Sequence, residues 1–303
     1  MLINPTLAFI FTVLALIIQV AKSNEPSIIN FYVDNQSQTK GKLNSKDDPY
    51  HRINDVFNYL QSLTETPSQA NIYLAPSMEP YSMKEDRRGI TLFHNLAISS
   101  WIVDNPKLCK GQPNCPERAT LSFKDCSYQV ISSDKGVFRM SDLNLIGEDG
   151  ELTITDSQFE LENIEFIGPF GTKMVFIYQK NGPRALIRNI KADATNSGGL
   201  YWYLKEHQKQ DPLIEISNIS LKLGLRNIDS SKNGLFEIVS EDRIGSLSIQ
   251  NINIERTNPY DQISLRTIFS LRNLNKVSLS EFKISGFKFN EINTPLIDLG
   301  KIS

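Results

Sequence analysis

The sequence predicts an all-β fold in which short parallel strands wind into a solenoid, each coil stacked on the one before it. One phrase occurs six times: apolar, polar, apolar, a short polar stretch, then apolar, any residue, apolar. A second series of short β-rich runs falls between these phrases. A period of about 20 to 35 residues is typical of repeats that bury their apolar side only by stacking. The six copies occupy residues 138–145, 159–166, 185–192, 214–221, 247–254 and 277–284.

Each phrase turns about one short polar residue, its pivot. The apolar alternation on either side predicts two short strands with inward apolar side chains, and its interruption predicts a sharp bend. Asn and Asp accept the left-handed backbone conformation that such a bend requires. Stacking would therefore align the pivots in a ladder of side chains at one corner, with a looser bend at Glu281. The pivots, which are 21, 26, 29, 33 and 30 residues apart, are Asp142, Asn163, Asn189, Asn218, Asn251 and Glu281.

The β-rich runs between the pivots predict a third strand in each coil. With the two strands around the bend they give a three-sided coil, and strands one coil apart would pair in parallel. No stretch after Ala70 has a sustained helical period, which argues against folds that alternate strands and helices. The runs cover residues 174–178, 200–204, 235–239, 267–271 and 295–299.

Corner asparagines, three short strands per coil and an amphipathic helix ahead of the coils resemble the pectate-lyase-like right-handed parallel β-helix superfamily. The resemblance is one of pattern, covers roughly Ile72 to the C-terminus, and implies a single-stranded right-handed parallel β-helix. It does not extend to catalytic motifs, because the Asn-Thr-Asp, Gly-His-Gly and Arg-Ile-Lys sequences of the polygalacturonases do not occur in this chain. That fold carries lyases, hydrolases, adhesins and inert surface proteins, so the resemblance implies a shape rather than an activity.

Residues 50–63 predict a short amphipathic helix ahead of the coils. Asp47 or Asp48 could cap its start, and Pro49 suits an early helical position. We interpret the helix as a cap over the open end of the solenoid, where backbone edges need cover; the alternative is a surface helix packed on the core. The chain then divides into an N-terminal segment, 24–70, and a β-helix domain, 71–303, whose first strand begins at Asn71. The apolar face of the helix would consist of Ile53, Val56, Phe57, Leu60 and Leu63.

Residues 1–23 predict a signal peptide. Residues 7–21 are nearly all apolar, and the small residues Ala21 and Ser23 fit cleavage after Ser23. About fifteen apolar residues are few for a membrane span. We therefore expect a secreted or extracellular protein, and the alternative is a chain anchored in a membrane by an uncleaved N-terminal segment.

Secretion would place the cysteines in an oxidising compartment. Cys109 and Cys115 bracket a five-residue loop in a Pro-rich insertion, which predicts a local disulfide. Cys126 is expected to fill an inward strand position, and the sequence leaves open whether it is free. Three spaced cysteines without a neighbouring histidine predict no zinc site or other metal site. Asn35 begins a glycosylation sequon in a polar stretch, whereas Asn218, also in a sequon, falls in the predicted ladder, where a glycan would fit poorly.

The charge pattern argues against nucleic acid as a partner. The net charge is −2 over 303 residues, the charges are dispersed, and no basic patch is present. No nucleophile motif, phosphate loop or metal-ligand spacing points to a cofactor or to catalysis. Of the three histidines, His51 is expected on the helix, His94 in an early strand and His207 in a Lys-rich loop, and we assign none a catalytic role.

One predicted column of side chains could contact a sugar. If the residues before them point inward, four residues stack outward, and the carboxylates of Glu237 and Asp298 would then lie two coils apart, about 9 to 10 Å. This is near the upper end of the roughly 6.5–9.5 Å that separates the two carboxylates of inverting glycosidases. Tyr201, Tyr203 and Glu237 are therefore candidate glycan contacts, and Glu237 with Asp298 is the alternative catalytic pair of a polysaccharide hydrolase or lyase. The inward residues would be Trp202, Phe236, Phe269 and Ile297, and the outward ones Tyr203, Glu237, Ser270 and Asp298.

Residues 295–303 predict a last strand with nothing after it to cover its edge. An uncapped coil invites self-association, unless the chain is a truncated piece of a longer surface protein. The sequence thus favours a secreted or cell-surface β-solenoid with a structural or interaction role, without catalysis. Its expected partners are carbohydrate, another surface protein or a second copy of the chain.

Overall fold

The structure is a computed structural model, and the account below is confined to the residues that it describes. They are residues 28–64, 67–83, 90–92, 95–101, 117–124, 126–132, 136–146, 151–155, 157–167, 175–180, 184–194, 200–206, 213–223, 236–240, 245–256, 268–272, 274–286 and 297–299.

Within these ranges almost all regular structure is β, and one helix, α2 (Ile53–Ser62), stands ahead of most strands. The strands of the larger sheet are β1 (Ile28–Val33), β2 (Gln69–Leu74), β3 (Tyr81–Ser82), β5 (Asn95–Ser100), β6 (Thr120–Ser122), β8 (Val137–Ser141), β9 (Asn144–Ile146), β11 (Gln158–Phe166), β13 (Arg184–Ala194), β15 (Leu213–Leu223), β17 (Gly245–Arg256) and β19 (Leu274–Ser285). Those of the smaller sheet are β4 (Ile90–Leu92), β7 (Ser127–Ser132), β10 (Glu151–Thr155), β12 (Val175–Lys180), β14 (Leu200–Glu206), β16 (Phe236–Ser240), β18 (Phe269–Arg272) and β20 (Ile297–Leu299).

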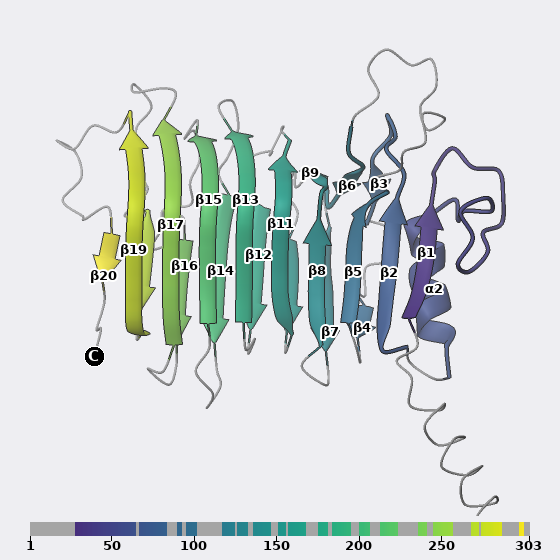
Figure 1. Ribbon diagram of the computed structural model, residues 1–303, viewed down its shortest axis with the longest axis horizontal. Coiled ribbons are helices and arrows are strands. Elements are labelled where there is room, and N and C mark those ends of the chain that lie inside the picture. The colour runs from purple at the N-terminus through teal and green to yellow at the C-terminus, as the bar shows by residue number, and fades with distance from the viewer. Residues whose placement is uncertain are drawn as a thin grey trace, which may run out of the picture.

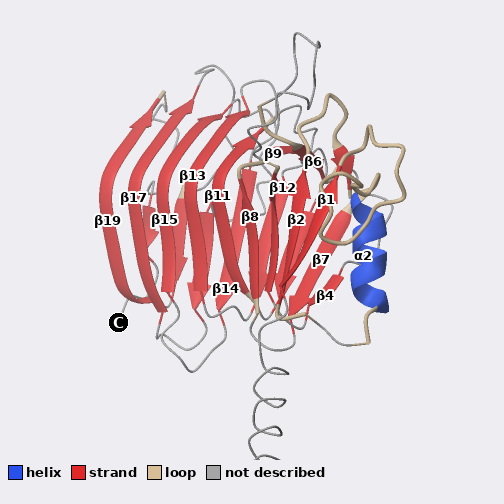
Figure 2. Cartoon of the chain, turned by 45° about the vertical axis from the view of Figure 1, so that its right-hand side comes forward, coloured by secondary structure: helices blue, strands red, loops and turns tan. Residues whose placement is uncertain are grey.

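The two sheets lie one behind the other, and the chain alternates between them (Figure 1). In the larger sheet the order β1-β2-β5-β8-β11-β13-β15-β17-β19 follows the chain, and in the smaller sheet β4 to β20 follow it as well. Neighbouring strands pair in parallel, as in β13 with β15 and β14 with β16. Figure 2 shows the same succession from the side. The predicted all-β, solenoid-like architecture is therefore confirmed, and each predicted third strand falls in the smaller sheet.

The long strands of the larger sheet bend at the predicted pivots. All six pivots have φ between 53° and 57°, the left-handed region that Asn and Asp tolerate best. Glu281 has φ 57°, so the looser bend expected there is absent from the backbone. Glu281 differs from the other pivots in its side chain, which is longer and makes no hydrogen bond to Asn251 among the described contacts.

The other pivots form a hydrogen-bonded ladder along the corner. In each step the Nδ2 atom of an asparagine donates to the Oδ1 atom of the pivot one coil earlier, from Asn251 down to Asp142. A side-chain amide can donate and accept at once, so the chain of bonds continues through every asparagine. The four N–O distances are 2.8 Å for Asn251–Asn218, Asn218–Asn189 and Asn189–Asn163, and 3.0 Å for Asn163–Asp142.

The core consists of inward side chains that repeat from coil to coil. Ile187, Ile216 and Ile249 are neighbours in register and at most 1% exposed. Aromatic rings stack in the same way: the Phe236 and Phe269 centroids are 4.9 Å apart with a 12° interplanar angle. Because each coil buries its apolar side only against the coils beside it, burial is complete in the middle of the stack and depends on caps at its ends.

The N-terminal end differs from the sequence prediction in two respects. The first described strand is β1, which pairs with β2 ahead of the predicted start at Asn71. The helix begins at Ile53, after an N-cap, Arg52, that makes no side-chain cap hydrogen bond, so Asp47, Asp48 and Pro49 do not start it. Figures 1 and 2 show α2 at the β1 end of the stack, and its Val56 and Phe57 are fully buried in the common core.

The outer edge of β1 is covered by residues 42–50. Asn30 accepts a backbone hydrogen bond from Asn44 at 2.9 Å and donates its own N–H to Asn44 Oδ1 at 2.7 Å. Further along, Tyr50 N–H donates to the carbonyl of Tyr32, and Asp34 N–H donates to that of Tyr50. This segment satisfies backbone groups that a solenoid end otherwise leaves open.

Candidate ligand-binding site

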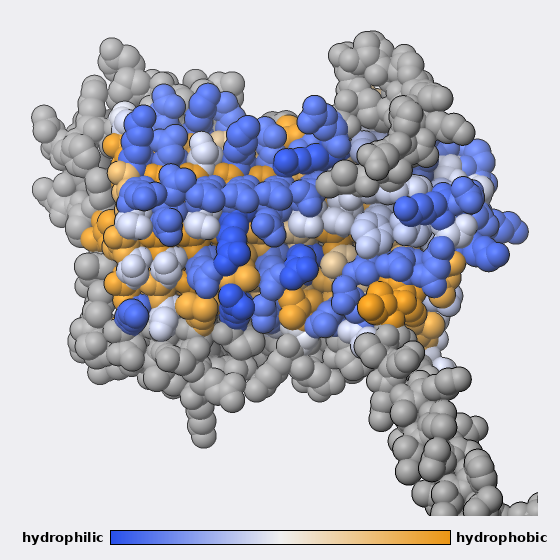
Figure 3. All heavy atoms as spheres, in the orientation of Figure 1, coloured by the Kyte–Doolittle hydropathy of each residue, from blue (hydrophilic) through white to orange (hydrophobic). Residues whose placement is uncertain are grey.

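Polar side chains cover the outer face of the larger sheet in rows that follow the stack. Figure 3 shows them as blue rows crossing the strands. One row lies just before the pivots and is called the pre-pivot row here. In register order it consists of Tyr32, Tyr73, Ser99, Ser141, Glu162, Arg188, Ser217, Gln250 and Ser280.

The pre-pivot row begins with an aromatic cluster. The Tyr32 and Tyr73 rings are stacked, with centroids 5.2 Å apart and an interplanar angle of 19°. The Trp101 ring, from just beyond β5, tilts against Tyr32 at 51° with centroids 5.0 Å apart. Both tyrosines are half-buried and Trp101 is buried. Side chains on consecutive parallel strands thus form a continuous aromatic surface.

This aromatic surface lines an open pocket of about 350 Å³, which we call the aromatic pocket. The next two residues of the row, Ser99 and Ser141, are small, so space remains beside Tyr73. The pocket is lined by Tyr32, Lys46, Tyr73, Ser99, Ser100, Trp101 and Asp142. Three aromatic rings and four polar or charged side chains thus line the pocket, a combination of apolar surface and polar groups that small-ligand sites use.

Polar groups of both signs border the aromatic pocket. Lys46 is exposed, and its Nζ lies 5.5 Å from the centroid of the Tyr32 ring, a cation–π distance. Asp142, the acceptor at the end of the ladder, supplies a carboxylate with more acceptor positions than its one bond from Asn163 uses. Ser100 is fixed beneath it, since its Oγ donates to the Asp142 carbonyl and accepts the Ala119 N–H at 2.8 Å.

The aromatic cluster contains two hydrogen-bond donors at neutral pH, and the second of them is buried. Burial, and to a smaller extent the neighbouring Tyr32, raises the pKa of Tyr73, so its phenol keeps its proton. The Nε1–H of Trp101 is buried and has no acceptor among the described residues. A buried N–H without an acceptor is costly, so a bound water or a ligand oxygen would be favoured there.

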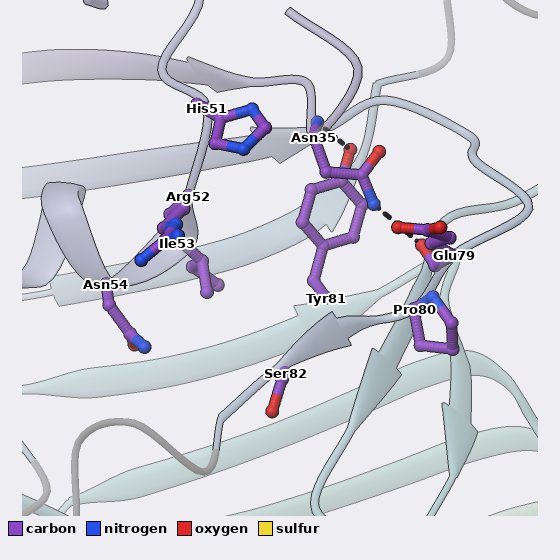
Figure 4. Close-up of a pocket in the computed structure, with 9 residues that line it drawn as sticks. All are labelled: Asn35, His51, Arg52, Ile53, Asn54, Glu79, Pro80, Tyr81 and Ser82. Atoms are coloured by element: carbon purple, nitrogen blue, oxygen red, sulfur yellow. Dashed lines mark hydrogen bonds between the residues drawn. The ribbon is translucent and has the colours of Figure 1, made fainter.

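A second pocket, of about 260 Å³, lies in the N-terminal cap. Figure 4 shows residues from the start of α2 on one side and Glu79 and Pro80 on the other. The Oδ1 of Asn35 and the Nδ1 of His51 are buried there without a hydrogen-bond partner in the described part of the chain. A polar cavity of this size readily holds ordered water, which would satisfy both atoms. It lacks the stacked rings of the aromatic pocket.

Tyr81 forms the floor of this cap pocket and ties it to the core. Its hydroxyl lies 2.8 Å from the carbonyl of Ala75 and 3.2 Å from that of Val33. Burial raises the pKa of Tyr81 well above its ordinary value, so the group remains a neutral donor. Tyr81 therefore has a structural role.

The residues predicted as a sugar-contacting column are in the predicted register. Tyr203 pairs with Glu237, Glu237 with Ser270, and Ser270 with Asp298. Ser270, however, is fully buried, and its Oγ has no partner among the described residues, so the column is not an exposed face at its centre. The side chains of Tyr201, Tyr203, Glu237 and Asp298 lie outside the described residues. Glycan contact by Tyr201, Tyr203 and Glu237 and catalysis by Glu237 and Asp298 therefore remain hypotheses.

Other sequence predictions are met only in part by the described residues. His51 precedes α2 instead of lying on it, while His94, His207, Cys109 and Cys115 lie outside the described residues. Cys126 lies just before β7 instead of within a strand, and it is half-buried against the core, where its Sγ donates to the Phe123 carbonyl at 3.1 Å.

The side-chain amide of Asn35, the predicted glycosylation site, is partly engaged in contacts within the protein. Its Nδ2 donates to the Glu79 carbonyl at 2.8 Å, and its Oδ1 is buried. A glycan attached to Nδ2 would replace one of the two amide hydrogens, so the remaining hydrogen would have to make the bond to the Glu79 carbonyl. Glycosylation remains a prediction.

No three His, Cys, Asp or Glu side chains in the described residues lie close enough together to hold a metal ion. In the same residues, no helix combines the length and apolar character needed to cross a bilayer.

The sequence does not reveal the aromatic pocket, because its three rings come from three separate segments. Tyr32 lies in a strand that has no pivot, and Trp101 lies just past the end of another strand. A signal was present in the alternation of residues 28–33 and 69–74, which sets Tyr32 and Tyr73 opposite to the inward residues beside them. Only the register of β1 with β2 brings the two tyrosines together.

Comparison of the chain with protein-family models, curated proteins and solved structures found no match.

Proposed function

We propose that this chain is a secreted or cell-surface right-handed parallel β-helix that binds carbohydrate at the aromatic pocket, without catalysis. The right hand is supported by the general preference of parallel strand-to-strand connections within one sheet. The three strands per coil and the left-handed corner residues agree with the pattern of such helices. The apolar run at residues 7–21 supports export.

The stacked pair of Tyr32 and Tyr73 beside Trp101 carries the binding proposal. A sugar ring presents an apolar face of C–H groups, which packs on an aromatic ring, and a rim of hydroxyls, which need donors and acceptors. The aromatic pocket offers both kinds of surface, with Asp142 and Ser99 at its border. Lys46 already places a cation over the Tyr32 ring, which disfavours a cationic ligand and leaves a neutral or acidic saccharide as the better fit.

Binding can be followed through Trp101. The chain has two tryptophans, so a Trp202→Phe background leaves Trp101 as the single indole reporter. We would titrate this variant with hexasaccharides of β-1,4-glucose, β-1,4-N-acetylglucosamine and α-1,4-galacturonate and record its fluorescence. Saturable binding is expected for at least one of them.

Matched variants test whether the aromatic pocket is the binding site. Tyr73→Ala should weaken binding at least tenfold, whereas Tyr73→Phe, which keeps the ring, should retain most of it. Gln250→Ala, in the same row but far along the stack, should have no effect. If none of the hexasaccharides binds, or if Tyr73→Ala binds as well as the parent, the proposal is wrong.

A reducing-sugar assay on the same mixtures tests the alternative function. A hydrolase or lyase that uses Glu237 and Asp298 would release new ends or unsaturated products, and Glu237→Gln would abolish the release. A binding protein would release none.

A further inference from the structure

The C-terminal end of the larger sheet is open in the described structure. Strand β19 pairs with β17 on one side, and no described strand lies on its other side. Its inward residues Val277, Leu279, Phe282 and Ile284 are only partly buried, whereas their register partners Leu247, Ile249, Ile252 and Ile254 are at most 2% exposed. The apolar side of the last described coil therefore lacks the neighbour that completes burial elsewhere.

The opposite end of the stack cannot supply this neighbour. The outer edge of β1 is occupied by residues 42–50, whose backbone and side chains bond to Asn30, Tyr32 and Asp34. A second copy therefore cannot continue the sheet head to tail through β1 without displacing that segment. Among the described strands along the main path of the larger sheet, the edge that remains for pairing on another copy is its own β19.

The polar and apolar positions of β19 form a nearly symmetric sequence about the point between Ser280 and Glu281. Reading outward in both directions gives polar, apolar, polar, apolar, polar. If two β19 strands pair antiparallel about this point, each inward apolar residue meets an inward apolar residue. The opposed pairs would be Ser280 with Glu281, Leu279 with Phe282, Ser278 with Lys283, Val277 with Ile284 and Lys276 with Ser285.

We propose that β19 is a homodimer interface, in which two copies join end to end through antiparallel β19 strands. The two-fold axis passes through the corner, between Ser280 and Glu281, along the normal to the sheet. Rotation about this axis reverses the strand and the stack direction but keeps the inner side of the corner facing inward. The bend at Glu281 in one copy is therefore matched by the same bend in the other, and the interface is closed and self-complementary.

Charges on β19 permit this register. Lys276 and Lys283 each face a serine across the interface, so no like charges are directly opposed. The single unfavourable contact is diagonal, between the two Glu281 side chains beside the axis. Replacing Glu281 with asparagine removes this repulsion and suits the left-handed backbone at least as well.

Sedimentation velocity on the full chain at micromolar concentrations tests the association. A monomer–dimer equilibrium is expected, and Glu281→Asn should lower the dimer dissociation constant by at least threefold. A misfolded variant would give heterogeneous aggregates instead of a tighter dimer, and sedimentation velocity distinguishes the two. Only monomer up to the highest soluble concentration, or growth into open-ended polymers, would overturn the proposal.

Disulfide cross-linking tests the register. Ser278 and Lys283 face each other across the axis, so an oxidised mixture of Ser278→Cys and Lys283→Cys chains should form a covalent dimer. Each variant alone should not, because two copies of the same position lie several residues apart along the strands. The unmodified chain, with its three native cysteines, is the control. Cross-linking of either variant alone, or failure of the mixture to cross-link, contradicts this register.

Discussion

The Nδ2 atom of Asn163 donates a hydrogen bond to the Oδ1 atom of Asp142 at 3.0 Å, and with this bond the corner ladder ends on an acceptor. An asparagine in the middle of the ladder must donate to one coil and accept from the next. A carboxylate can only accept, so Asp142 suits the one position from which no further donation is needed. The direction of the ladder thus explains where the aspartate lies, and it places a carboxylate with acceptor capacity beside the aromatic pocket.

Substitution at a central pivot should show what the ladder contributes. Asn189→Leu removes two side-chain hydrogen bonds and forces a branched residue into φ 55°, so we expect a loss of about 1 to 3 kcal/mol in unfolding free energy. Asn189→Gly keeps the bend without strain and should lose less. Urea denaturation followed by circular dichroism measures both. Lys191→Leu, an exposed change two residues away, is the control, and an equal loss there would contradict the role of the pivot.

The pivots and third strands could be predicted because they repeat. A bend that needs a left-handed residue leaves Asn or Asp at a fixed place in every coil, and two-residue alternation marks the strands around it. Strand β1 has the alternation but no pivot and no fixed spacing from the next copy, so the repeat pattern does not mark it as a strand of the solenoid. The coverage of its edge by residues 42–50 depends on backbone hydrogen bonds that leave no pattern in the side chains.

The candidate site could not be predicted, since it depends on which face a neighbouring segment covers. Alternation placed Ser270 on an outer face, but the residue is fully buried. Conversely, Tyr32, Tyr73 and Trp101 are far apart in sequence and meet only through the register of three strands. Periodicity predicts the direction of a side chain relative to its own strand, and it does not predict what packs against that face.

Removal of the hydroxyl should change the unfolding free energy differently at two buried serines, Ser100 and Ser270. Ser100→Ala breaks contacts to the Asp142 carbonyl and the Ala119 N–H, so we expect a loss of about 1 to 3 kcal/mol. Ser270→Ala removes a buried hydroxyl that has no partner in the described residues and should leave stability unchanged or raise it by up to about 1 kcal/mol. Urea denaturation of the pair provides the comparison. A clear loss in Ser270→Ala would mean that its hydroxyl is satisfied.

Gly41 directly precedes residues 42–50, the segment that covers the outer edge of β1. Gly41 has φ 82°, and a Cβ there would lie 2.5 Å from Cγ and 2.8 Å from Cα of Tyr50. Gly41→Ala therefore combines backbone strain with a clash against main chain, and we expect a loss of roughly 2 to 4 kcal/mol. Gly286→Ala makes the same backbone change at φ 81° on an exposed residue and should cost less. Equal losses in urea denaturation would rule out the contact with Tyr50 as the cause.

The predicted signal peptide determines which residue should be the N-terminus of the mature protein. If residues 1–23 are a signal peptide, protein recovered from the medium of expressing eukaryotic cells should begin at Asn24. N-terminal sequencing checks this. Intact Met1 in a membrane fraction would favour the anchored alternative.

Tyr81 should make stability depend on pH in the alkaline range. Burial raises its pKa in the folded state above the unfolded value of about 10, so at higher pH the unfolded chain loses a proton that the folded chain keeps. The stabilisation is complete below about pH 10 and declines as the pH rises toward the folded pKa.

Tyr81→Phe separates this effect from the hydroxyl contacts. At neutral pH the variant loses the 2.8 Å contact to the Ala75 carbonyl and should be about 1 kcal/mol less stable. Above about pH 10 its stability should fall less steeply than that of the parent chain, because one titrating group is gone, while Tyr50 and Tyr73, whose pKa values burial also raises, titrate in both proteins. Urea denaturation at about pH 7, 9 and 10.5 gives the two curves. A constant gap between them across this range would show that Tyr81 titrates alike in the folded and unfolded chains.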